Sequence, residues 1–85
     1  MDQVTSLFGL LTLSLANAAL VGLGLVPEPE NGKTSKDLQS AAHNIELLAM
    51  LQQKTKGNLD PEEQHLINGL LYDLRLKYIE GQTKA

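Results

Sequence analysis

Residues 4–26, VTSLFGLLTLSLANAALVGLGLV, carry no charged side chain over 23 consecutive positions. On a helix with about 100° between neighbouring residues, the large apolar side chains of this stretch point in every direction around the axis. They are Leu7, Phe8, Leu10, Leu11, Leu13, Leu15, Leu20, Val21 and Leu23. A helix with no polar face must be covered on all sides by protein or by lipid. The stretch predicts a long apolar helix over about residues 2–25.

Both ends of this first helix have a local signal. Asp2 stands where a carboxylate complements the positive end of the helix dipole. Pro27 follows two glycines and ends the helix, because a residue that precedes proline is pushed out of the α region. The segment Pro27-Glu28-Pro29, followed by Asn31-Gly32, then predicts an extended piece and a turn.

A second helix is predicted over about residues 36–55, with Thr34 and Asp37, or Ser35 alone, as its cap. Gly57 is expected to take the left-handed conformation after its last turn. One face of this helix is apolar and the opposite face is polar, which is typical of a helix at the surface of a protein core. The apolar positions are Leu38, Ala41, Ala42, Ile45, Leu48, Ala49 and Leu51.

A third helix is predicted over about residues 61–80, after a connection of only a few residues. Asp60 is its N-cap, Pro61 its first residue, and Glu63 the reciprocal partner in a capping box. The short connection makes the second and third helices an antiparallel αα-hairpin. Residues 81–85 are predicted to fray. The apolar face is expected to comprise Leu66, Ile67, Leu70, Leu71, Leu74, Tyr78 and Ile79.

The composition limits the classes of function. A chain of 85 residues forms one small domain, in a size range where a single core is marginal. It has no cysteine, so disulfides and thiolate metal sites are excluded. The net charge of −3 and the three aromatic residues do not favour nucleic-acid binding. We expect a single helical domain over residues 1–80 in the cytoplasm.

Self-association is expected because the hairpin can cover only about half of the first helix. Small residues form two stripes on that helix, and small stripes let helices approach closely. One stripe is Ser14, Ala18 and Gly22, and the other is Thr5, Gly9, Thr12, Ala16 and Ala19. The predicted fold is all-α, with three helices packed as a homodimeric bundle. The predicted interface comprises Leu7, Leu11, Ser14, Leu15, Ala18 and Gly22.

A membrane location is the alternative. The uncharged stretch is long enough to cross a bilayer as a helix of about 34 Å. Its serines, threonines and glycines dilute the hydropathy, and no basic region precedes it as in a signal peptide. In this alternative the protein associates with the inner membrane, and Lys33 and Lys36 favour a cytoplasmic hairpin.

No catalytic, cofactor-binding or metal-binding residue is predicted. Each histidine has a carboxylate three residues away, as His43 with Glu46 and Glu62 with His65. Metal sites in helical bundles need several such pairs that project inward, so we interpret both histidines as surface residues. Tyr72 is expected to pack with its hydroxyl in water, and Arg75 to pair with a nearby carboxylate. The third and least favoured function is an enzyme or metal protein with a site between chains.

Several ordered stretches along nearly the whole chain are similar to those of one known family. They are Leu13-Ser14-Leu15, Ala18-Ala19-Leu20, Leu23-Gly24, Pro27-Glu28-Pro29, Ile45, Leu48, Met50-Leu51, Lys54-Thr55-Lys56-Gly57-Asn58-Leu59, Glu62-Glu63 and Leu70-Leu71-Tyr72-Asp73-Leu74-Arg75. With them the chain resembles a small bacterial family known as domain of unknown function 1844. The resemblance implies a helical domain of bacterial origin and transfers no reaction and no catalytic residue. Many members have a charged N-terminal extension, which is not present here, and Pro-Asp-Pro in place of Pro27-Glu28-Pro29.

We therefore expect a non-enzymatic dimerisation or protein-interaction module, with a second copy of the chain or another protein as its partner and no cofactor. Ala18 is expected to face a neighbouring helix at close range, because it lies midway along the first small stripe.

Overall fold

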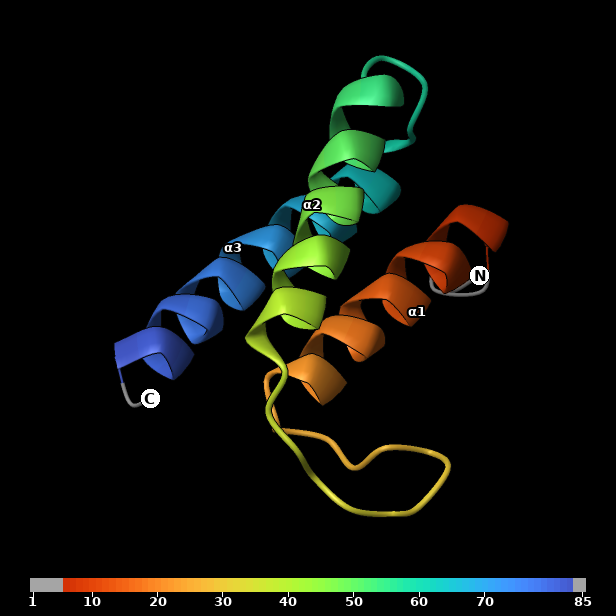
Figure 1. Cartoon of the computed structure of the whole chain (residues 1–85). Coiled ribbons are helices and arrows are strands. Elements are labelled where there is room, and N and C mark those ends of the chain that lie inside the picture. Colours follow the sequence, from red (N-terminus) through yellow and green to blue (C-terminus); the bar gives the residue numbers. More distant parts are fainter. Residues whose placement is uncertain (1–5, 84–85) are drawn as a thin grey trace.

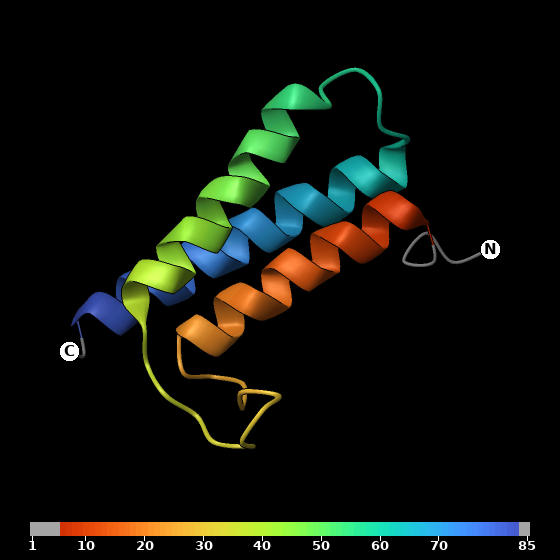
Figure 2. The ribbon, with the colours of Figure 1, turned by 45° about the vertical axis from the view of Figure 1, so that its right-hand side comes forward.

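The computed structural model describes residues 6–83. In that range it has three α-helices and no strand: α1 (Leu7–Gly22), α2 (Leu38–Lys54) and α3 (Pro61–Thr83). α1 and α3 run in the same direction, and α2 runs opposite to both (Figures 1 and 2). The predicted all-α class is confirmed, and the second and third helices form the predicted antiparallel hairpin.

α1 begins later than predicted. Ser6 caps it, and the hydroxyl of Ser6 accepts a hydrogen bond of 2.9 Å from the amide of Gly9. A serine in the extended conformation at this position satisfies one of the free amides of the first turn. Asp2, where the helix was predicted to begin, lies outside the described residues.

α1 also ends before the predicted residue 25. Gly24 has a φ of +77°, and its amide donates to the carbonyl of Val21 at 3.0 Å. The amide of Leu25 donates to the carbonyl of Leu20 at 3.1 Å. These two bonds form a Schellman motif, which satisfies the last carbonyls of the helix. The motif ends α1 before Pro27 can do so.

α2 begins two residues later than predicted, and of the predicted cap residues it is Asp37 that caps it. Asp37 is the N-cap, and its carboxylate accepts a hydrogen bond of 3.0 Å from the amide of Ser40. Ser35, one of the predicted caps, instead donates to the carboxylate of Glu28 in the preceding loop. Beyond the other end, where Thr55 is the C-cap, Gly57 has a φ of +87° and so takes the predicted left-handed conformation.

α3 begins as predicted. The amide of Glu63 donates to the Asp60 carboxylate at 2.8 Å, and the amide of Asp60 donates to the Glu63 carboxylate at 3.1 Å. This reciprocal pair is the predicted capping box.

The predicted fraying of α3 after residue 80 is wrong for residues 81–83, which are helical. The ammonium of Lys36 donates to the carbonyl of Gly81 at 3.0 Å, so a loop lysine binds a carbonyl of the last turn. An added Cβ at Gly81 would lie 3.4 Å from Leu38 and 3.6 Å from Leu23, which places this turn against the core. Residues 84–85 lie outside the described range.

The loop between α1 and α2 is held by Glu28. Its amide donates to the carbonyl of Lys33 at 2.8 Å, and its carbonyl accepts from Gly32 at 2.9 Å. Its carboxylate accepts from Asn31 at 3.3 Å and from Ser35. Gly32 has a φ of +68°, in agreement with the predicted Asn-Gly turn. The loop is therefore organised by its own polar groups.

The core combines large side chains from α2 and α3 with small ones from α1. α1 packs mainly against α2. Small residues on α1 let the helix axes approach closely. The buried core comprises Ala16, Ala19, Leu23, Ala41, Ile45, Leu48, Ile67, Leu71 and Leu74.

Candidate interaction surfaces

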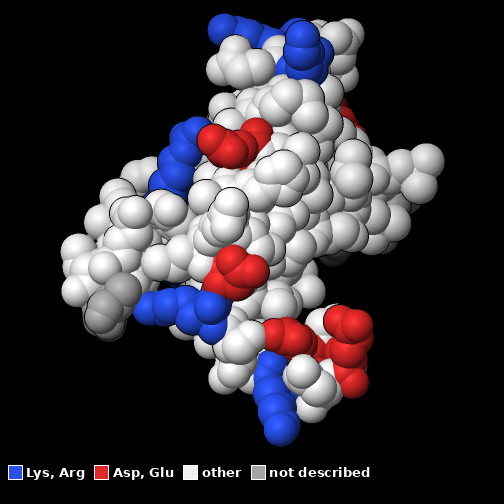
Figure 3. All heavy atoms as spheres, viewed as in Figure 1, with Lys and Arg blue, Asp and Glu red and all other residues white. Residues whose placement is uncertain are grey.

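The side of α1 that points away from the core is apolar and uncharged. We define the outer α1 face as the exposed residues Leu7, Leu10, Leu11, Ser14 and Asn17, with half-buried Ala18 and Val21. Leu7 is 85% exposed, Leu10 51% and Leu11 47%. Acidic and basic side chains lie elsewhere, and the surface over α1 is free of them (Figure 3). Charged residues normally lie on the outward side of a surface helix. An outward side that is apolar and uncharged is typical of a helix that another surface covers.

The predicted interface residues do not all lie on this face. Leu7, Leu11 and Ser14 are exposed, and Ala18 is half-buried beside them. Leu15 is half-buried and packs against the core. Gly22 is buried, and a Cβ added there would lie 2.8 Å from the amide nitrogen of Ala41. Gly22 therefore serves the contact between α1 and α2 of its own chain and is not available to a second copy.

The second small stripe of α1 faces inward. Gly9, Thr12, Ala16 and Ala19 are all buried. The stripe permits close packing, as predicted, but it does so within the chain. Its remaining member, Thr5, lies outside the described residues.

α3 has a second exposed apolar stripe, which sequence reasoning missed. Tyr72 is 70% exposed, Leu76 47% and Ile79 55%. The predictions that Tyr72 packs and that Ile79 belongs to the core face are wrong, because Ile67, Leu71 and Leu74 occupy the inward side of the helix. The spacing of Tyr72, Leu76 and Ile79 by four and three residues was the available signal.

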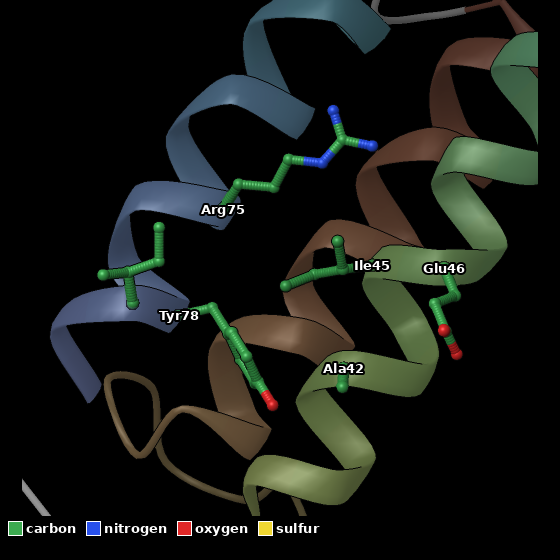
Figure 4. A pocket seen from close by; sticks show the side chains of 6 residues that line it. Ala42, Ile45, Glu46, Arg75 and Tyr78 are labelled. Atoms are coloured by element: carbon green, nitrogen blue, oxygen red, sulfur yellow. The ribbon is translucent and has the colours of Figure 1, made fainter. Parts of the chain in front are cut away.

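A shallow hollow of about 440 Å³ lies between α2 and α3 (Figure 4). Ile45 and Tyr78 point into the space between the two helices, whereas Glu46 points away from α3. Arg75 extends over the same space and makes no ion pair within residues 6–83, where Lys77 with Asp73 at 2.7 Å is the ion pair found. The prediction that Arg75 pairs with a carboxylate is wrong for this range. The lining residues are Ala42, Ile45, Glu46, Arg75, Tyr78 and Ile79.

Neither histidine lies in a cluster of metal-ligating residues. His43 and His65 are exposed on α2 and α3. Within residues 6–83, no three histidine or carboxylate side chains are grouped so that they could hold a metal ion. In the same range, no helix combines the length and the hydropathy that a membrane crossing requires.

The fold and these surfaces define a small three-helix protein with apolar outer faces on α1 and α3. The chain belongs to the family described as domain of unknown function (DUF1844), whose model matches residues 5–80. No curated protein and no solved structure matches it.

Proposed function

We propose that this chain is a non-enzymatic self-association module in which two copies pair through the outer α1 face. The observation that carries the proposal is an outward helix face with three exposed leucines and no charge. Burial of such a face away from water lowers the free energy. The same face of a second copy also carries no charge, so no like charges meet in the pair. Twofold dimers are the commonest oligomers, and they use the same patch on both subunits.

The order of residue sizes along the outer α1 face favours an antiparallel pair. The large residues Leu7, Leu10 and Leu11 come first, and the smaller Ser14 and Ala18 follow. If two α1 helices cross at Ser14, the leucines of each copy lie opposite the smaller half of the other. Large-to-small pairing fills the interface without overpacking.

The gain from pairing is limited, because Leu10 and Leu11 are already about half buried in the single chain. The loss of rotational and translational freedom opposes association. We expect a dimer that dissociates on dilution, so its mass must be measured over a range of protein concentration.

Sedimentation equilibrium tests the proposal. Wild-type chain should exceed its monomer mass of 9.2 kDa as concentration rises. Leu11→Lys should lose pairing through the outer α1 face and show a lower mass than wild type at each concentration, because it places a charge in the centre of the apolar face. Gln39→Lys, at an exposed position on α2, is the matched control and should associate as wild type does. A wild-type chain with a helical circular dichroism spectrum and a mass of 9.2 kDa at every concentration would contradict the proposal.

A further inference from the structure

The exposed stripe of α3 has the spacing of a coiled-coil seam. We define the α3 seam as His65, Gly69, Tyr72, Leu76, Ile79 and Thr83, which alternate at four and three residues. All six are exposed. The seam lies on the side of α3 opposite the buried Ile67, Leu71 and Leu74. A stripe with this repeat packs against another helix by inserting each side chain into a hole on the partner.

The charges that flank the seam select the direction of the partner helix. Asp73 and Glu80 each follow an apolar seam residue on one flank, and Arg75 precedes Leu76 on the other. In a parallel pair, a residue on the Arg75 flank meets the partner's residue five positions later on the acidic flank. Arg75 then lies beside the partner's Glu80. In an antiparallel pair each flank meets the same flank of the partner. The flank of Asp73 and Glu80 would then face the partner's acidic flank, and the two would repel each other.

Both side chains of this pair are available. Arg75 and Glu80 are exposed, and within residues 6–83 neither makes an ion pair. Asp73, in contrast, is bound by Lys77 at 2.7 Å. Twofold symmetry would supply two contacts between Arg75 and the partner's Glu80.

We propose that a second copy of this chain covers the α3 seam, with the two α3 helices parallel and in register. The pairing does not depend on the outer α1 face, which lies on another helix. With both surfaces in use, the chain forms a dimer of dimers.

Disulfide trapping tests the direction. The chain has no cysteine, and a Cβ at Gly69 would meet no atom within 4 Å, so Gly69→Cys fits. Under mild oxidation, Gly69→Cys chains should form covalent dimers faster than Gln39→Cys chains, the control for random collision. In an antiparallel pair Gly69→Cys alone would not be trapped, and a mixture with Thr83→Cys chains would be. Equal rates for Gly69→Cys and Gln39→Cys, or trapping in the mixture alone, would overturn the proposal.

A charge swap tests the register. Arg75→Glu and Glu80→Arg should each weaken seam association by about tenfold, because each turns two attractive contacts into repulsive ones. The double variant exchanges the signs of the two charges and should restore the affinity, whereas a double variant as weak as the single ones would contradict the register.

Leu11→Lys should leave the disulfide trapping of Gly69→Cys unchanged. This result would separate the test of the α3 seam from the test of the outer α1 face.

Discussion

Gly22 and Gly69 both lie within helices, yet only Gly22 is enclosed. A Cβ at Gly22 would lie 2.8 Å from the Ala41 nitrogen and 3.0 Å from the Asp37 carbonyl oxygen, and both are backbone atoms that cannot rotate away. Gly22→Ala should therefore lower the free energy of unfolding by about 1–3 kcal/mol, as overpacking does. Urea denaturation of the purified variants measures this change.

Gly69→Ala is the matched control. It meets no atom within 4 Å and gains helix propensity, so it should raise stability by about 0.5–1 kcal/mol. If both variants are stabilised, the close contact between α1 and α2 at Gly22 is wrong.

Thr12 places a polar atom in the core without a partner. The residue is fully buried, and within residues 6–83 its hydroxyl makes no hydrogen bond. A buried hydroxyl without a partner costs free energy, and valine has almost the same shape without it. Thr12→Val should raise the melting temperature measured by circular dichroism. A lower melting temperature would show that the hydroxyl is bound in solution.

The capping box is the clearest single contribution of local sequence to α3. Asp60 and Glu63 exchange two hydrogen bonds at the start of the helix. Asp60→Ala should cost about 1 kcal/mol of stability, measured by thermal or urea denaturation, because the amide of Glu63 loses its partner. Asp60→Asn retains an acceptor oxygen and should cost much less. Equal losses in both variants would indicate that the carboxylate acts through its charge instead.

Helix starts could be predicted from sequence where the cap and its partner are neighbours, as at Asp60. Helix ends could not be predicted from sequence where they depend on contacts with distant residues. The last turn of α3 is held by Lys36, which lies 45 positions from Gly81 along the chain. No pattern among neighbouring residues indicates a hydrogen bond between positions so far apart.

For the whole molecule, the antiparallel α1 pair makes a prediction about Ala18. In that pair Ala18 lies opposite a leucine of the partner, so Ala18→Leu overpacks the interface at a cost of about 1–3 kcal/mol. Association measured by sedimentation equilibrium should weaken accordingly. Ala18→Ser keeps the residue small and should associate as wild type does. Unchanged association of Ala18→Leu would exclude Ala18 from the interface.

Salt should separate the two proposed contacts. The outer α1 face has no charge, so association through it should not weaken between low and high ionic strength. Pairing along the α3 seam uses exposed ion pairs, which salt screens, and should weaken. At two salt concentrations, sedimentation of Leu11→Lys measures association through the α3 seam, and sedimentation of Arg75→Glu measures mainly association through the outer α1 face. Salt relieves the repulsion that Arg75→Glu places at the seam, so association of this variant that weakens as salt is raised would contradict the apolar α1 contact.

The sequence by itself determined the all-α class, the three helices, the capping box of α3, and the left-handed conformation at Gly57. Each of these depends on residues within one or two helical turns. It also identified the uncharged first helix, but periodicity could not show which side of that helix the chain covers. Only the tertiary structure decided that Gly9, Thr12, Ala16, Ala19 and Gly22 face inward and that Leu7, Leu10 and Leu11 face outward. The reason is geometric. The inward side needs small residues so that α1 can approach α2, and a helix that is apolar all round satisfies that need on one side while it leaves these three leucines on the other.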